Sequence, residues 1–303
     1  MRRFSTLTPI DGLLLLMVLI WGSNFSLIKA ALVHIPSQQF NALRLTVATA
    51  VFLCAVTVKG WPAIPRRDWL MMAGIGFIGH FVYQLCFVGG LSLSTASNSS
   101  LILGVSPVAV AVASAMAGHE RLTKNQMIGA VLSVGGIYFV VGTGAHFSGT
   151  TLAGDLITLC GVGCWAVYTV ASRALLERYT PLVVTGVTMA LGSAIYVPAA
   201  IPGMLTMNVG AVPVWVWVAV VFSSFLALNV AYLIWYTAVQ RIGNIRTSVY
   251  SNVTPLVAIT VAATFLGERI TMTTLVGAAA ILGGVFVTRK AAGAKAEGPP
   301  AEE

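Results

Sequence analysis

The sequence contains very few charged residues. Asp, Glu, Lys and Arg together make up 9% of its 303 residues, whereas a soluble domain carries roughly 25%. Hydrophobic residues make up 57% of the chain. Because so little polar surface cannot cover a water-soluble globule, we expect an all-α integral membrane protein.

The chain also lacks the residue groupings that carry catalysis or metal binding. No Ser-His-Asp or Cys-His arrangement is visible, and no apolar segment holds a pair of carboxylates. All four cysteines lie in apolar segments, and no paired histidines complete a metal site with Cys160 and Cys164. The glycine-rich runs are not phosphate loops, because no Lys-Ser/Thr follows them. We predict no enzymatic activity, no metal and no cofactor, with a membrane-embedded enzyme or scaffold as the less favoured alternative.

The net charge of +8 is a topology signal and predicts no nucleic-acid partner, because Lys and Arg occur singly or in pairs between apolar runs. Of the 17 basic residues, only Lys29, Arg44 and Arg269 fall on one side of the expected membrane topology, which leaves 14 on the other. The positive-inside rule then places both termini in the cytoplasm.

Ten segments are apolar and long enough to span a bilayer, each with about 20 residues. They cover residues 10–33, 37–58, 68–92, 96–117, 124–143, 154–176, 181–203, 213–238, 245–266 and 272–288. Residues 1–9 form a cytoplasmic N-terminus, and residues 289–303 form a polar tail that we expect to be disordered. Arg2 and Arg3 precede an apolar run like a signal peptide, but no small-residue cleavage site follows, so we expect an uncleaved first span.

The chain contains an internal repeat. At an offset of 148, eleven of forty positions between residues 97–136 and 245–284 are identical, including a proline, a Glu-Arg pair and paired glycines. At an offset of 144, Asp11 and Trp21 match Asp155 and Trp165. The unit is therefore five spans, at residues 10–143 and 154–288. Because five is odd, the second copy enters the membrane inverted, which is the architecture of many secondary transporters.

Each copy has a proline near the middle of its fourth span. Pro107 and Pro255 lack an N–H and clash with the carbonyls of Leu103 and Ser251. Backbone groups that lose their helical hydrogen bonds in this way are tolerated at membrane depth only where they are buried inside the protein or line a water-filled cavity. We predict helix kinks there, with a hinge slightly favoured over a static bend.

Several spans carry aromatic and polar residues at i, i+3/i+4, i+7 spacing, so that each set faces one way. Converging aromatic side chains with a few polar groups are typical of a small-molecule pocket. The alternative for any single Ser, Thr or Asn is a hydrogen bond between packed helices. For His80, a core role and a role in substrate contact or proton coupling are evenly matched. The predicted substrate-binding residues are Trp21, Asn24, His80, Tyr83, Gln84, Asn98, Ser100, Trp165, Tyr168, Asn229, Tyr232, Tyr250 and Ser251.

A few charged residues lie inside or at the ends of spans. Arg44 lies roughly 10 Å below the outer end of the second span. We favour outward snorkelling of its side chain over contact with a substrate carboxylate. Lys29 is expected to anchor a span at the interface. The pairs Glu120-Arg121 and Glu268-Arg269 are expected to form helix-end ion pairs or caps.

These features resemble the EamA-type branch of the drug/metabolite transporter superfamily. The resemblance rests on Trp-Gly-Ser-Asn-Phe at residues 21–25, Arg44, the two span prolines, Gly-x-Glu-Arg-Leu at 118–122 and Leu-Gly-Glu-Arg-Ile at 266–270. It covers roughly residues 10–290 and implies a ten-helix basket around a central cavity, lined by the first, third, fourth, sixth, eighth and ninth spans. It also implies transport by alternating access. More narrowly, the chain is similar to bacterial exporters of aromatic and other amino acids.

We therefore expect an inner-membrane exporter of neutral amino acids or similar small metabolites. Its partners would be the lipid bilayer and a small-molecule substrate, and one chain would suffice for function. The alternative is a multidrug or other metabolite transporter of the same superfamily. A cation exporter would be expected to hold a buried acid in the first span, where this chain has Asn24. Proton antiport through His80 and facilitated diffusion both stay open.

Overall fold

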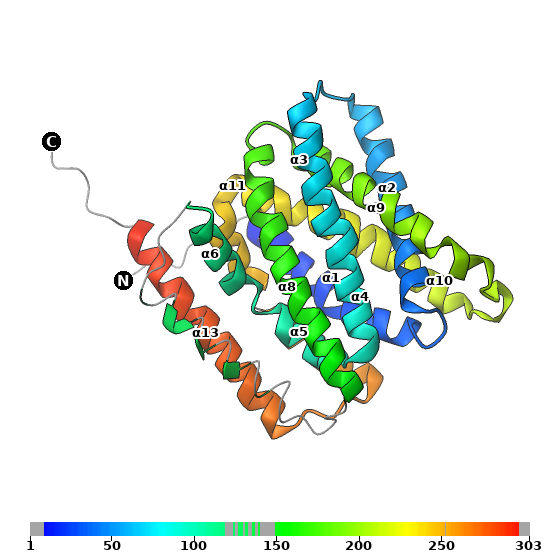
Figure 1. The fold of residues 1–303 in the computed structure, drawn as a ribbon. Coiled ribbons are helices and arrows are strands. Elements are labelled where there is room, and N and C mark those ends of the chain that lie inside the picture. The colour runs from blue at the N-terminus through cyan, green and yellow to red at the C-terminus, as the bar shows by residue number, and fades with distance from the viewer. Residues whose placement is uncertain are drawn as a thin grey trace.

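The computed structural model describes residues 9–118, 149–251 and 253–296, together with residues 124, 127–129, 131–132, 135–136 and 139. Its regular elements are all helical, and the residues it describes form no strand. Figure 1 shows the helices gathered into one bundle. The predicted span at 124–143 and the pair Glu120-Arg121 lie largely or wholly outside the described residues.

The helices follow one another with short connections. Those before residue 118 are α1 (Pro9–Ala31), α2 (Ser37–Lys59), α3 (Arg66–Gly76), the π-helical η1 (Phe77–Val82), α4 (Tyr83–Leu93), α5 (Ala96–Leu103) and α6 (Ser106–Met116). Those after residue 148 are α8 (Gly149–Leu176), α9 (Pro181–Leu205), the short η2 (Val209–Ala211), α10 (Val214–Phe222), the π-helical η3 (Ser223–Val230), α11 (Ala231–Ser251), α12 (Thr254–Val261), the π-helical η4 (Ala262–Leu266) and α13 (Met272–Ala296).

Seven of the described helical segments are long and apolar enough to cross a membrane. They are Pro9–Ala31, Ser37–Lys59, Arg66–Leu93, Ala96–Met116, Gly149–Leu176, Pro181–Leu205 and Val214–Ile242, with shorter apolar helices at Thr254–Leu266 and Met272–Gly284. The protein is therefore a multi-pass membrane protein, and nine of the ten predicted spans coincide with helices in the part of the chain that the structure describes. One boundary differs from the prediction, because α11 continues through residues 243–244, where a break was expected.

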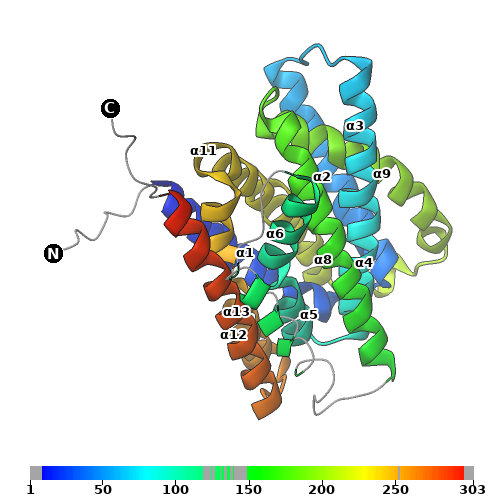
Figure 2. The ribbon, with the colours of Figure 1, turned by 60° about the vertical axis from the view of Figure 1, so that its left-hand side comes forward.

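The central helices approach one another through glycines. At Gly90 on α4, a Cβ atom would lie 2.3 Å from Thr158 Oγ1 and 2.8 Å from the carbonyl oxygen of Gly154, both on α8. At Gly76 on α3, it would lie 2.5 Å from the carbonyl oxygen of Thr188 on α9. Small residues allow such close approach, which drives helix association in membranes. In Figures 1 and 2, α13 lies beside α6 at the flank of the bundle, away from α2 and α9.

Both proline positions coincide with an interrupted helix. The helix α5 ends at Leu103 and α6 begins at Ser106, so Pro107 lies in the first turn of α6. Likewise, α11 ends at Ser251 and Pro255 lies in the first turn of α12. A proline in the first turn loses no intrahelical hydrogen bond. The Ser106 hydroxyl donates to the Leu103 carbonyl oxygen at 2.6 Å. This bond supplies a partner for a carbonyl group at the interruption of the helix.

The repeat extends to an unusual backbone feature. The π-helical segment η1 covers residues 77–82, and the repeat offset of 148 places these at residues 225–230, inside η3. Helices of this type are rare and occur mostly as short insertions in α-helices, often near functional sites. The two copies therefore share a distortion in their third span, although their sequences have diverged there.

One ion pair ties the start of α3 to the connection between α8 and α9. Arg178 Nη1 lies 2.6 Å from Asp68 Oδ1, and the Tyr179 hydroxyl donates to Asp68 Oδ2 at 2.7 Å. The hydrogen bond to this carboxylate raises the pKa of Tyr179, because it stabilises the protonated phenol.

Candidate functional site

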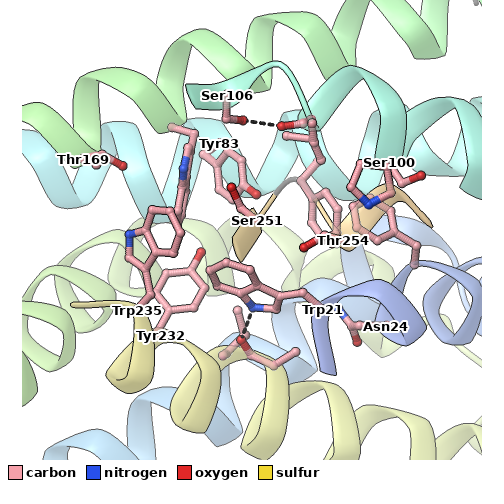
Figure 3. A pocket seen from close by; sticks show the side chains of 18 of the residues that line it. Trp21, Asn24, Tyr83, Ser100, Ser106, Thr169, Tyr232, Trp235, Ser251 and Thr254 are labelled. Atoms are coloured by element: carbon pink, nitrogen blue, oxygen red, sulfur yellow. Dashed lines mark hydrogen bonds between the residues drawn. The ribbon is translucent and has the colours of Figure 1, made fainter. Parts of the chain in front are cut away.

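A cavity lies at the centre of the bundle, between helices that come from both halves of the chain (Figure 3). It offers about 100 Å³ to the centres of water molecules, each of which needs at least about 10–15 Å³ on this measure. The lining residues are Trp21, Asn24, Phe25, Arg44, Tyr83, Gln84, Phe87, Ser100, Leu103, Gly104, Ser106, Pro107, Val110, Trp165, Thr169, Ala227, Leu228, Tyr232, Trp235, Ser251, Thr254 and Pro255. Both helix breaks therefore open onto this cavity.

The structure brings eight of the thirteen predicted substrate-binding residues together around the cavity. They are Trp21, Asn24, Tyr83, Gln84, Ser100, Trp165, Tyr232 and Ser251. The other five, His80, Asn98, Tyr168, Asn229 and Tyr250, do not line it.

Aromatic rings form one wall of the cavity. Trp165 on α8 lies 6.0 Å from Trp21 and 5.6 Å from Tyr232 between ring centroids, and both pairs are edge-to-face. Trp235 lies 5.6 Å from Trp21. Figure 3 shows Trp21, Tyr232 and Trp235 converging. Edge-to-face contacts at these distances are favourable, so the rings support one another while presenting apolar surface to a ligand.

Trp21 also joins the two halves of the chain. Its indole N–H donates to the carbonyl oxygen of Ala227 in η3 at 3.0 Å (Figure 3). The amide of Asn24, one turn later on α1, accepts a hydrogen bond from the Ser223 hydroxyl at 2.6 Å. These two bonds fix α1 against the π-helical segment and hold the cavity wall in place.

His80 and Tyr168 lie behind the aromatic wall. The His80 side chain has no exposed area, and its Nε2 lies 3.0 Å from the Tyr168 hydroxyl. That hydroxyl lies 3.0 Å from Thr188 Oγ1 on α9. The chain of polar groups links η1, α8 and α9, whereas His80 Nδ1 is buried and has no hydrogen-bond partner among the described residues.

The remaining three predicted residues join helices. The Asn98 amide donates to Asp155 Oδ2 at 3.3 Å, and Ser94 also donates to this carboxylate. The Asn229 amide donates to the Ala48 carbonyl oxygen at 2.9 Å. The Tyr250 hydroxyl donates to Asp11 Oδ1 at 2.6 Å. These contacts match the interhelical role that was the alternative for such residues.

The expectation that Arg44 snorkels outward is wrong. Its side chain is only 1% exposed, lines the cavity, and lies with Cζ 5.9 Å from the ring centroids of both Phe40 and Phe87. The helix α2 packs along α9 and also contacts α4 and η3, so the face that carries Arg44 is turned into the protein. Distance from a span end therefore did not determine whether this side chain reached water.

Twelve lining residues belong to neither the predicted substrate-binding set nor the predicted kinks. One group of four among them is Leu103, Gly104, Ser106 and Val110. All lie within four residues of Pro107, so the helix break itself was the available signal.

At the end of the bundle where α4 ends and α5 begins, one set of polar contacts connects the halves of the chain and another lies within the first half. The Glu268 carboxylate accepts hydrogen bonds from the backbone N–H groups of Ala96 at 2.7 Å and Ser97 at 3.0 Å. It thus caps α5, a helix of the other half, where an acid suits the helix dipole. Lys29 Nζ donates to the carbonyl oxygens of Leu91 at 3.0 Å and Ser92 at 3.1 Å, at the end of α4.

No group of three or more His, Cys, Asp or Glu residues among those described could hold a metal ion. The cavity wall instead combines aromatic rings, amides, hydroxyls and one guanidinium, which suits noncovalent binding of a small organic molecule.

Comparisons with known proteins agree with a transport function. Residues 8–142 and 152–289 match one family, described as the EamA-like transporter family. The chain is 27% identical to the uncharacterized transporter YyaM of Bacillus subtilis, with 88% of each protein covered. It is 29% identical to a probable terminal-alkyne amino-acid exporter of Streptantibioticus cattleyicolor, over 94% of this chain and 95% of that protein. It is 25% identical to a probable amino-acid metabolite efflux pump of Escherichia coli, over 91% and 94%.

A solved crystal structure also shares the fold. It superposes with a TM-score of 0.69 at 22% sequence identity, covering 94% of this chain and 98% of the other.

Proposed function

The chain belongs to the EamA-like transporter family, and on this ground we propose that it exports neutral amino acids, aromatic ones included, or similarly small metabolites across the plasma membrane. The observation that carries the proposal is the central cavity, whose aromatic and polar wall draws on both halves of the chain. Several relatives named for amino-acid or amino-acid metabolite export support the substrate class.

The charges on the cavity wall argue against the alternative of a drug-like cation. Among the lining residues, Arg44 is the one charged group, and none is Asp or Glu. A cationic substrate would be repelled by the guanidinium and would find no lining carboxylate to replace its hydration.

We propose the complete architecture as ten spans in two inverted five-helix repeats, at residues 10–143 and 154–288, with both termini in the cytoplasm and one chain as the working unit. A pair of equivalent acids supports this arrangement. Asp155 begins the sixth span and bonds to Asn98 in the fourth, whereas Asp11 begins the first span and bonds to Tyr250 in the ninth. Each repeat thus attaches the start of its first span to the broken span of the other repeat.

Alternating access would use the two helix breaks. The interruptions before Pro107 and Pro255 both border the cavity, so the half-helices on either side can tilt without breaking a continuous hydrogen-bond ladder. The Glu268 contacts with Ala96 and Ser97 join the halves at one end of the bundle, which is the outer end in the proposed orientation. Release of the substrate at that end would require these contacts to open.

The proposal is tested with purified protein in liposomes and labelled phenylalanine, leucine and alanine. We expect saturable transport, reduced about two- to tenfold in Trp165→Ala, because one aromatic contact is worth about 0.5–1.5 kcal/mol. Trp69→Ala is the matched control, since Trp69 is 38% exposed and does not line the cavity. Absence of transport of all three amino acids by folded wild-type protein would refute the substrate class, and equal loss in both variants would refute the cavity as the site.

Measurement of the same flux with and without an imposed pH gradient separates proton antiport from facilitated diffusion. Because His80 does not line the cavity, we expect His80→Phe to leave any dependence on the gradient unchanged in folded protein.

A further inference from the structure

A buried cation without a partner lies in the cavity wall. Arg44 is 1% exposed, and neither its Nε nor its Nη1 has a hydrogen-bond partner among the described residues. The one salt bridge among those residues joins Arg178 to Asp68, far from this site in the sequence. A buried charge is strongly unfavourable unless it is paired and hydrogen-bonded, so the guanidinium lacks an anion that a ligand could supply.

The neighbours of the guanidinium stabilise a cation only in part. The rings of Phe40 and Phe87 each lie 5.9 Å from Arg44 Cζ, which gives weak cation–π attraction. The phenols of Tyr83 and Tyr232 line the same cavity. A phenol carries no charge at neutral pH, so none of these groups neutralises the arginine.

The same wall holds an unused acceptor. Gln84 lines the cavity and is 1% exposed, and its Oε1 has no hydrogen-bond partner among the described residues. A cavity with unpaired donors on Arg44 and an unpaired acceptor on Gln84 is complementary to a ligand that carries an anion and an N–H donor.

We propose that Arg44 binds the carboxylate of the transported molecule and that Gln84 Oε1 accepts a hydrogen bond from its amine, while the aromatic wall receives an apolar side chain. The substrate class is therefore a small zwitterionic or anionic monocarboxylate. A guanidinium presents parallel N–H donors that match the two oxygens of a carboxylate, which a lysine cannot reproduce. This inference rests on the proposed transport function and adds the recognition chemistry.

The test is a binding titration of purified wild-type protein in detergent, followed by fluorescence of the cavity tryptophans. The probes are L-phenylalanine, L-phenylalaninamide, which lacks the carboxylate, and 3-phenylpropionate, which lacks the amine. We expect the amide to bind at least about tenfold more weakly than phenylalanine, as is usual for a lost charge-assisted hydrogen bond. We expect 3-phenylpropionate to bind more weakly than phenylalanine but to keep its dependence on Arg44.

Three variants assign the discrimination to its residue. Arg44→Gln should reduce the ratio of phenylalanine to phenylalaninamide affinity to about one, and Arg44→Lys should restore part of it. Arg241→Gln is the matched control, because Arg241 is an exposed arginine on α11 outside the cavity, and it should keep the wild-type ratio. Should Arg44→Gln fail to fold, the wild-type probe series still tests recognition of the carboxylate, and Arg44→Lys tests the residue.

The outcomes separate this inference from the proposed function. If wild-type protein transports labelled phenylalanine but binds the acid and the amide equally, the role of Arg44 is refuted and transport stands. Retention of the wild-type ratio in Arg44→Gln refutes it in the same way. If folded wild-type protein neither binds nor transports phenylalanine, both the binding of a carboxylate by Arg44 and the assignment of amino acids as substrates are refuted.

Discussion

The contact between α4 and α8 offers a sharp test of the structure, because two adjacent glycines on α4 have opposite surroundings. A Cβ at Gly90 would lie 2.3 Å from Thr158 Oγ1, 2.8 Å from the Gly154 carbonyl oxygen and 2.9 Å from the Thr158 nitrogen. Two of these atoms are backbone, so they can move only if α8 moves. At Gly89, a Cβ would meet nothing within 4 Å.

We expect Gly90→Ala to destabilise the protein by about 1–3 kcal/mol, the usual cost of overpacking. We expect Gly89→Ala to be neutral or to stabilise it by up to about 1 kcal/mol, because alanine loses less backbone entropy in a helix than glycine. The two variants should therefore differ by about 1–4 kcal/mol, which thermal or denaturant unfolding in detergent can resolve.

The same interface positions Gln84 and Trp165 on the cavity wall, so Gly90→Ala should also lower transport in the liposome assay. Equal stability of Gly90→Ala and Gly89→Ala would show that α4 and α8 do not approach this closely. Reduced stability with unchanged transport would show that the cavity tolerates a shift of the interface, which would contradict the tight positioning argued above.

Two further substitutions test hydrogen bonds between the halves of the chain. Glu268→Gln keeps the side-chain shape but removes the charge at the start of α5, so we expect a loss of stability of about 1 kcal/mol, whereas exposed Glu177→Gln should change nothing. Trp21→Phe removes the bond to the Ala227 carbonyl oxygen and keeps an aromatic ring, so we expect a loss of about 1 kcal/mol and weaker substrate affinity. Melting curves measure both, and an unchanged melting temperature in either variant would contradict the corresponding contact.

The class of protein and most of its helices could be predicted from composition and span length, because the membrane allows only a few backbone arrangements. Each long apolar run must form a helix to satisfy its own backbone groups. The repeat located the two prolines, and both occur at helix interruptions beside the cavity. These features follow from local sequence and from the lack of hydrogen-bonding water in the bilayer core. Their prediction therefore required no knowledge of neighbouring helices.

Contacts across the bundle could not be predicted in this way, and Arg44 shows why. Its depth in the span was compatible with snorkelling or burial, and the choice depended on which face of α2 met other helices. Phe40, Arg44, Ala48 and Phe52 follow one another at intervals of four, and all are buried. That spacing placed the arginine on an apolar helix face, which was a stronger indication of burial than its distance from the membrane surface.

The π-helical segments explain why the predicted polar stripes held in one part of a span and failed in another. In the third span, Tyr83, Gln84 and Phe87 line the cavity, but His80 in η1 does not. In the eighth span, Tyr232 and Trp235 line it and the predicted Asn229 in η3 does not, although Ala227 and Leu228 in the same segment do.

The prediction assumed 3.6 residues per turn throughout each span, whereas a π-helical segment has hydrogen bonds between residues i and i+5. Such a segment rotates the side chains before it around the helix axis relative to the side chains after it. In the third span, the side chains after η1 reach the cavity, and His80 within η1 turns toward Tyr168 on α8. In the eighth span, Ala227 and Leu228 within η3 line the cavity, whereas Asn229 turns toward the Ala48 carbonyl on α2. Both repeats carry the distortion at the same place, so a constant period of 3.6 residues misplaces side chains in both halves of the cavity wall.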